Sequence, residues 1–216
     1  MATLSNITIS GQLKSQDRWF IVALSAYGCA LGYSIVMINL LARASTLADP
    51  QRLQIPEAIP TYGAGAMAGI FAAGLVAYAV HLGGHDWPLT VGSWMLLSIG
   101  FALIFSLVAG GLFLPIAVIL VDFLHGQMDP IELVLASTDA LARSPVQALI
   151  GGVPIMFTSV VGSLLFGPVA WIIDRFHYSD QRTTSRYAPI SVATLIGLGI
   201  LVVFSILPTT LLARLG

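Results

Sequence analysis

The chain has 216 residues, of which 57% are hydrophobic and 9% are charged, and its formal net charge is −1. Soluble domains carry about 25% charged residues, so this composition excludes an ordinary water-facing surface. The near-neutral charge also excludes the basic surface that nucleic-acid binding needs. Cys29 is the single cysteine, which excludes both a disulfide framework and a thiolate metal cage.

Five apolar, charge-poor segments predict an all-α integral membrane protein with about five transmembrane helices. They cover residues 19–42, 62–80, 89–121, 146–173 and 189–213. Residues 1–18 are expected to form a short cytoplasmic segment. They lack the basic start and short apolar run of a cleaved signal peptide. Residues 19–216 then make up a single transmembrane domain.

The third apolar segment, residues 89–121, is longer than a membrane crossing requires. As one helix it would extend about 50 Å at ~1.5 Å per residue, against a hydrocarbon core of about 30 Å. Two interpretations stay open. The helix either tilts and overhangs the membrane, or it breaks at Gly110-Gly111, just before Pro115.

Two short motifs predict where the third and fourth spans begin. Asp86 precedes Trp87-Pro88 and is a candidate N-cap for the third span. Ser144-Pro145 offers the same combination of a capping side chain and an early proline for the fourth span.

A separate, short amphipathic helix is expected over residues 130–142. Asp129, Pro130 and Glu132 form a close variant of the capping box, with the glutamate at the third helical position. The segment is too short and too acidic to span a membrane, so we expect it to lie along the interface. Its apolar residues include Leu133, Leu135 and Leu141.

With five spans, the N-terminus and the loops at 81–88 and 174–188 share one side of the membrane. That side holds Lys14, Arg18, Arg175, Arg182 and Arg186, whereas the other holds Arg43, Arg52, Arg143 and Arg214. The excess favours a cytoplasmic N-terminus. The chain has eight arginines and one lysine, which indicates a GC-rich bacterial genome, so we expect the membrane to be the inner (plasma) membrane of a bacterium. The aromatic belt expected at the first interface comprises Trp19, Trp87, Trp94 and Trp171.

Small residues recur at every fourth position in three of the spans, a pattern that lets helix backbones approach closely in a membrane. The stripes are Gly28 and Gly32; Gly65, Gly69, Ala73 and Ala77; and Ser159, Ser163 and Gly167. The first interpretation is packing inside the chain's own helix bundle. The alternative is contact with another subunit.

Ionisable residues are nearly absent from the apolar segments, although they usually mark an ion path or a proton relay. The first three segments contain no Asp, Glu, Lys or Arg, and Asn39 is the most polar residue among them. This pattern disfavours a pump.

The stretch HLGGHDWPLT places His81 and His85 four residues apart, and five spans bring His177 to the same side. The two glycines between the first pair favour a helix end, with His81 as the last-turn cation. In the alternative, the three histidines bind a cofactor, and a haem or a chlorophyll-type pigment is the class that imidazoles would hold. A two-haem anchor is disfavoured, because the first, fourth and fifth segments contain no histidine.

Three functions follow from these patterns. The first is a non-catalytic membrane subunit of a larger complex, of a respiratory or photosynthetic kind, that contacts lipid or pigment and other subunits. The second is a small channel or transporter for an apolar or weakly polar solute. The third is a membrane cofactor carrier that uses His81, His85 and His177. No motif for a hydrolase, a nucleotide-binding protein or a zinc protease is present in a supporting context.

Overall fold

The computed structural model describes the backbone of residues 15–46, 55–83, 88–178 and 187–215. Within these ranges, side chains are described for residues 18–40, 59–83, 88–178 and 187–203. Most of the expected N-terminal segment, together with His85 and Asp86, lies outside the described residues.

Every element in the described part of the chain is helical. The order is α1 (Ser15–Thr46), α2 (Ile55–Leu82), α3 (Val91–Val108), the π-helix η2 (Ala109–Phe113), α4 (Leu114–Leu124), α5 (Pro130–Tyr178) and α6 (Ala188–Leu215). α1, α2, the continuous α3–η2–α4 rod and α5 are each long and apolar enough to cross a membrane. The described part of α6, Ala188–Val203, is apolar as well. The all-α membrane fold predicted from the sequence is confirmed.

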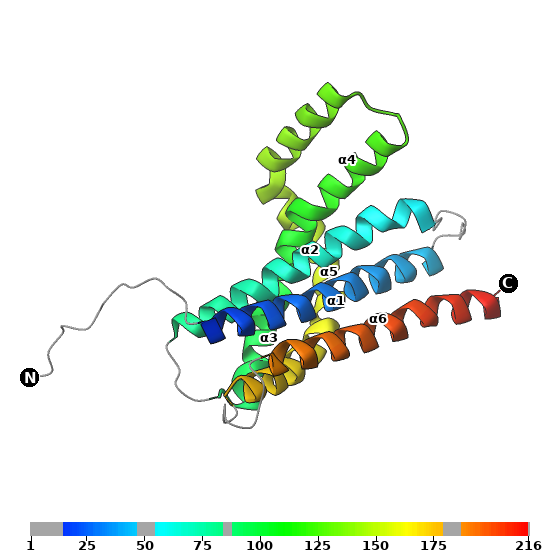
Figure 1. Ribbon diagram of the computed structural model, residues 1–216. Coiled ribbons are helices and arrows are strands. Elements are labelled where there is room, and N and C mark those ends of the chain that lie inside the picture. The colour runs from blue at the N-terminus through cyan, green and yellow to red at the C-terminus, as the bar shows by residue number, and fades with distance from the viewer. Residues whose placement is uncertain (1–14, 47–54, 84–87, 179–186, 216) are drawn as a thin grey trace, which may run out of the picture.

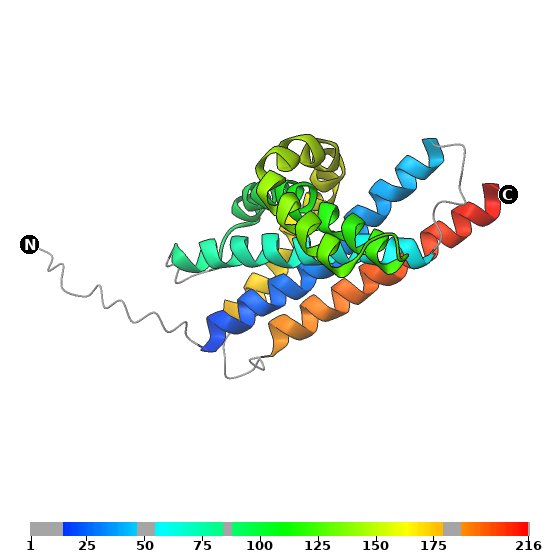
Figure 2. The ribbon, with the colours of Figure 1, turned by 90° about the horizontal axis from the view of Figure 1, so that it is seen from above.

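The helices form a layer and a hairpin that crosses it. Figures 1 and 2 show α1, α2 and α6 side by side, with α2 running opposite to the other two. The α3–η2–α4 rod and α5 run antiparallel and form a long helical hairpin. The starts of α1, α3 and α6 and the ends of α2 and α5 gather at one end of the molecule (Figure 1). This gathering is the arrangement that five spans require.

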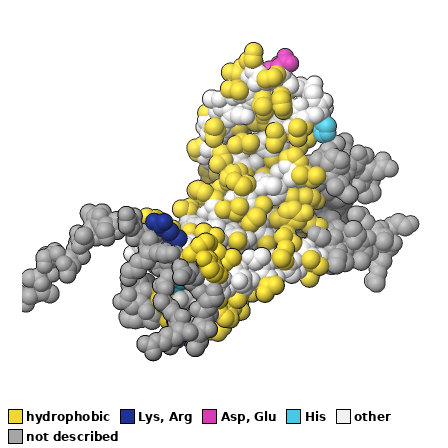
Figure 3. All heavy atoms as spheres, viewed as in Figure 1, with side chains coloured by type: hydrophobic (Ala, Val, Ile, Leu, Met, Phe, Trp, Pro, Cys, Tyr) yellow, Lys and Arg dark blue, Asp and Glu magenta, His cyan; other side chains and the backbone are white. Residues whose placement is uncertain are grey.

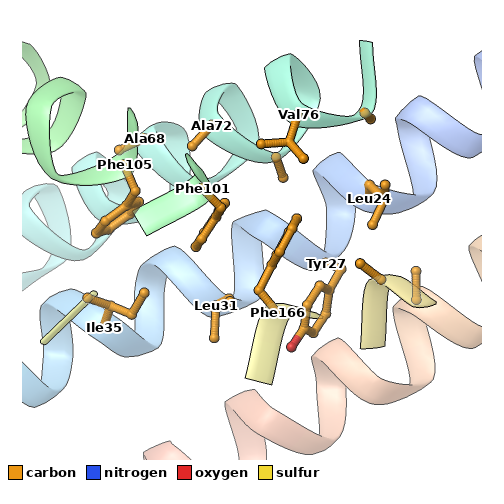
Figure 4. Packing of buried hydrophobic residues seen from close by; sticks show 14 of the residues in the cluster. Leu24, Tyr27, Leu31, Ile35, Ala68, Ala72, Val76, Phe101, Phe105 and Phe166 are labelled. Atoms are coloured by element: carbon orange, nitrogen blue, oxygen red, sulfur yellow. The ribbon is translucent and has the colours of Figure 1, made fainter. Parts of the chain in front are cut away.

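The core lies where the hairpin meets the layer, and Figure 4 shows its residues. Its large side chains come from α1, α3 and α5, while α2 contributes mainly alanines. Phe101 and Phe166 stack with ring centroids 4.3 Å apart, and Tyr27 stacks on Phe166 at 6.1 Å. Tyr27 also donates its hydroxyl to the Leu165 carbonyl at 3.1 Å, so its polar atom has a partner in the apolar interior.

The third apolar segment neither breaks nor stays a regular α-helix. It continues through Gly110-Gly111 as the π-helix η2, in which the Leu114 amide donates to the Ala109 carbonyl five residues back. Pro115 lies directly beyond this bond and has no amide to donate. The wider π turn accommodates the proline ring without interrupting the rod.

Both predicted helix starts for the third and fourth spans are wrong. α3 begins after Thr90, whose hydroxyl accepts from the Ser93 amide at 3.2 Å, and Asp86 precedes this cap by four residues. No helix begins at Ser144-Pro145, because α5 already runs from Pro130 and contains Pro145 in its interior. If one overlooks that a helix has already begun, a short polar side chain before a proline resembles the N-cap of a new helix.

The predicted capping box at the start of α5 is present. Glu132 accepts from the Asp129 amide at 3.0 Å, and the helix begins at Pro130. The helix expected over residues 130–142 exists, but it is the first part of the 49-residue α5 and not a separate element.

A tight glycine turn joins α4 to α5. Gly126 has φ 68°, a left-handed conformation that residues with a Cβ rarely adopt. Its amide donates to the Phe123 carbonyl, and the Gln127 amide donates to the Asp122 carbonyl, each at 3.0 Å. This pair of bonds is a Schellman motif, which ends α4 and turns the chain back into α5.

Candidate functional site

The α1 and α2 backbones make a close contact through their glycines. A Cβ on Gly32 would lie 2.9 Å from the Gly69 Cα, and one on Gly65 would lie 2.7 Å from the Gly32 carbonyl oxygen. A Cβ on Gly69 would collide with the Gly28 carbonyl oxygen. The four glycines therefore let two backbones touch directly, as small residues do between membrane helices.

The alanines of the α2 stripe continue the same contact. Ala73 and Ala77 are fully buried, and the Ala73 methyl group fills the space beside Gly28. The sequence left open whether the α2 stripe packs inside this chain or against another subunit. In the structure, α1 of the same chain covers it.

The stripe on α5 packs against α3. Ser159 and Ser106 share a hydrogen bond of 2.7 Å between their hydroxyls, and both side chains are buried. A Cβ on Gly167 would lie 2.7 Å from the Met95 sulfur. Ser163 is also buried, with its hydroxyl on the Val160 carbonyl of its own helix.

A second glycine contact holds the middle of the hairpin together. A Cβ on Gly110 would lie 2.7 Å from the Gly152 Cα, and one on Gly111 would lie 2.8 Å from the Ser144 carbonyl oxygen. The π-helix therefore presses its glycines against α5. No stripe in the sequence analysis included Gly110 or Gly152, because both lie in glycine pairs outside a four-residue repeat.

The most polar buried group lies where α3 begins and α5 ends. Asp174 is 1% exposed, and its Oδ2 accepts from the Trp94 indole nitrogen at 2.9 Å and from the Leu89 amide at 2.8 Å. Leu89 lies just before the first turn of α3, where unpaired amides and the helix dipole favour a negative charge. The carboxylate thus ties the end of α5 to the start of α3.

Two buried polar atoms in the last turns of α5 have no hydrogen-bond partner among the described residues: Asp174 Oδ1 and Trp171 Nε1. The Arg175 guanidinium lies 5.3 Å from the centroid of the Trp171 ring, within the range of a cation–π contact.

Sequence reasoning missed this carboxylate. It placed Asp174 in a loop beside the histidines and Trp94 in an aromatic belt, but both side chains are buried and bonded to each other. The run VAWIID gave the available signal, since a carboxylate directly after an apolar run needs a donor if the helix continues.

The structure places His81 and His177 on the ends of α2 and α5, at the same end of the molecule (Figure 1). The His81 ring lies 6.5 Å from Tyr78, and the His177 ring lies 5.0 Å from Phe20. His85 lies outside the described residues. Among the residues that are described, no group of three or more His, Cys, Asp or Glu side chains is arranged to hold a metal ion.

Comparisons of the chain with protein-family models, with curated proteins and with solved structures find no match.

Proposed function

We propose that the chain is a non-catalytic, multi-pass subunit of a larger complex in a bacterial inner membrane, of a respiratory or photosynthetic kind. Its role is to pack helices and to contact lipid or pigment and neighbouring subunits. The observation that carries the proposal is an apolar helix surface that the chain leaves uncovered, in a segment too charged to lie in hydrocarbon. That segment is the end of the hairpin where α4 turns into α5.

The length of α5 supports this reading. Its 49 residues extend about 74 Å at ~1.5 Å per residue, more than twice a hydrocarbon core of about 30 Å. Only 33% of the most apolar 18-residue stretch of α5 is buried inside the chain, compared with 61% of the corresponding stretch of α1. Much of α5 therefore needs a covering from outside the chain.

The closed interior favours a structural role over a solute path. The α1–α2 contact has backbone against backbone at Gly32 and Gly65, and the η2–α5 contact has the same at Gly110 and Gly152. The Ser106–Ser159 bond satisfies both hydroxyls within the protein. Polar groups that line a solute path would instead need to face it.

The proposed orientation has the N-terminus in the cytoplasm. The cytoplasmic end is then the gathering of helix ends around Asp174, with Arg18 and Arg175 nearby in the sequence of α1 and α5. The turn at Gly126 belongs to the opposite side, where the flanking segment carries mainly acidic residues.

The proposal is tested by native mass spectrometry after mild extraction from the organism's own membrane. Release of this chain together with a different polypeptide supports it. Release of the bare chain, under conditions that keep another assembly of that membrane intact, contradicts it.

A further inference from the structure

The first three turns of α5 carry an apolar stripe on the side opposite their own hairpin partner, which we call the outer stripe. It consists of Ile131, Val134, Leu135, Thr138, Leu141 and Ala142, all exposed. Ile131 is 75% and Leu135 65% exposed, whereas Ala140, on the other face of the helix, is buried. The spacing of three and four residues places the stripe on one continuous face of the helix.

Hydrocarbon does not cover this stripe. Residues 122–143 contain Asp122, Asp129, Glu132, Asp139 and Arg143. Charged side chains at this density are too costly for the bilayer core, so the segment lies at the interface or beyond it. In Figure 3 this end of the molecule shows many apolar side chains interspersed with other side chains and backbone, with an acidic group at the tip.

The charged residues beside the outer stripe are mainly acidic. Leu135 lies three residues after Glu132 and four before Asp139, so both carboxylates flank it on the helix surface. Arg143 is the sole Lys or Arg from Leu114 to Ser144, and its Nε lies 2.9 Å from the Asp139 carboxylate. The segment therefore presents four acidic residues against one arginine that is already paired.

These observations distinguish between three possible coverings of the outer stripe: the membrane surface, a second copy of the chain and a helix of another protein. Helices that lie on a membrane surface carry Lys and Arg on their polar face, and an acidic flank does not fit this pattern. A second copy of the chain that docked through this same segment would offer only Arg143, which is bound to Asp139. A helix with an apolar face and its own Lys or Arg complements both the stripe and its flank.

We propose that the outer stripe is the docking site for a helix of a partner membrane subunit, which packs apolar residues on Leu135 and Leu141 and carries Lys or Arg opposite Glu132 and Asp139. This inference rests on the proposed function, because it names the surface by which the chain joins its complex.

Photo-crosslinking in intact cells tests the proposal. A photoreactive amino acid replaces Leu135 in one variant and Leu195 in a matched control. Leu195 is 70% exposed and belongs to α6, which is not part of the hairpin. We expect the Leu135 variant to form an adduct with one other polypeptide, at a peptide with Lys or Arg within one helical turn of the crosslinked residue. The Leu195 variant should not form that adduct.

A charge variant tests the complementarity. Glu132→Gln keeps a side chain that can cap α5, and Asp139→Asn keeps the shape of its side chain. With both substitutions, the yield of the adduct at residue 135 should fall by about two- to fivefold, the range expected for exposed ion pairs. An unchanged yield would contradict the charge complementarity.

Three outcomes would overturn the inference: adducts with lipid alone, an adduct of twice the chain's mass, or a partner peptide without Lys or Arg. If any of these appears while other subunits still co-extract with the chain, the proposed function stands and the docking site is wrong. If nothing co-extracts, both fail.

Discussion

The indole nitrogen of Trp94 lies 2.9 Å from the Oδ2 of Asp174, in a contact between side chains that are 0% and 1% exposed. The two residues are 80 positions apart and lie on the two arms of the hairpin. A buried carboxylate is costly unless donors satisfy it, so this bond and the Leu89 amide together make the contact tolerable.

Trp94→Phe should destabilise the protein by about 1–3 kcal/mol, because it removes one donor from a buried acceptor. Thermal or denaturant unfolding of the purified protein in detergent measures the loss. Trp171→Phe is the matched control, since the Trp171 indole nitrogen has no hydrogen-bond partner among the described residues. An equal loss in both variants would show that ring volume, not the bond to Asp174, is the cause.

Gly69→Ala should destabilise the α1–α2 contact by about 1–3 kcal/mol, because the new methyl group meets the Gly28 backbone and neither helix can yield without moving the other. Gly63→Ala, on the same helix, has nothing within 4 Å of the added Cβ. Unfolding measurements on the two variants should separate them. A Gly69→Ala variant as stable as the original chain would contradict direct backbone contact between α1 and α2.

The Ser106–Ser159 bond should contribute modestly. A double-mutant cycle with Ser106→Ala and Ser159→Ala should give a coupling energy of about 0.6 kcal/mol, and at most about 1.7 kcal/mol, as measured for hydrogen bonds between membrane helices. The cycle removes the packing cost common to each single variant. A coupling near zero would place the two hydroxyls out of contact.

The gathering of helix ends predicts which loops share a side of the membrane. In a Cys29→Ser background, single cysteines at Gly83 and Tyr187 should react with the same membrane-impermeant thiol reagent on the same side. A cysteine at Gln127, in the turn between α4 and α5, should react from the opposite side. Labelling of all three from one side would contradict the five-span arrangement.

Much of the fold follows from the sequence, because the apolar segments are long and their charges sit outside them. Four of the five predicted spans fall within helices, and the third, predicted from residue 89, becomes helical at Val91. The predicted helix bounds differed most from those of the structure where a local helix-start motif lies inside a longer helix. Pro145 resembles a helix start, yet α5 continues through it as well as through Pro154 and Pro168. In a helix packed on a neighbour, the lost backbone bond is offset by that packing.

The site was less predictable, because it depends on contacts between distant residues. The glycine stripe on α2 was visible in the sequence, but its partner surface on α1 emerges only from the fold. Asp174 and Trp94 carry no shared local motif, and their bond requires the hairpin to be assembled first. The use of His81, His85 and His177 as cofactor ligands stays a prediction.

The central claim is that this chain works inside a larger membrane complex, and native mass spectrometry after mild extraction tests it most directly. The chain alone has a mass of 22.8 kDa. The account predicts larger ions that release this chain together with at least one different polypeptide on collisional activation. A bare chain or a homo-oligomer, from an extraction that keeps another complex of the same membrane whole, would contradict it.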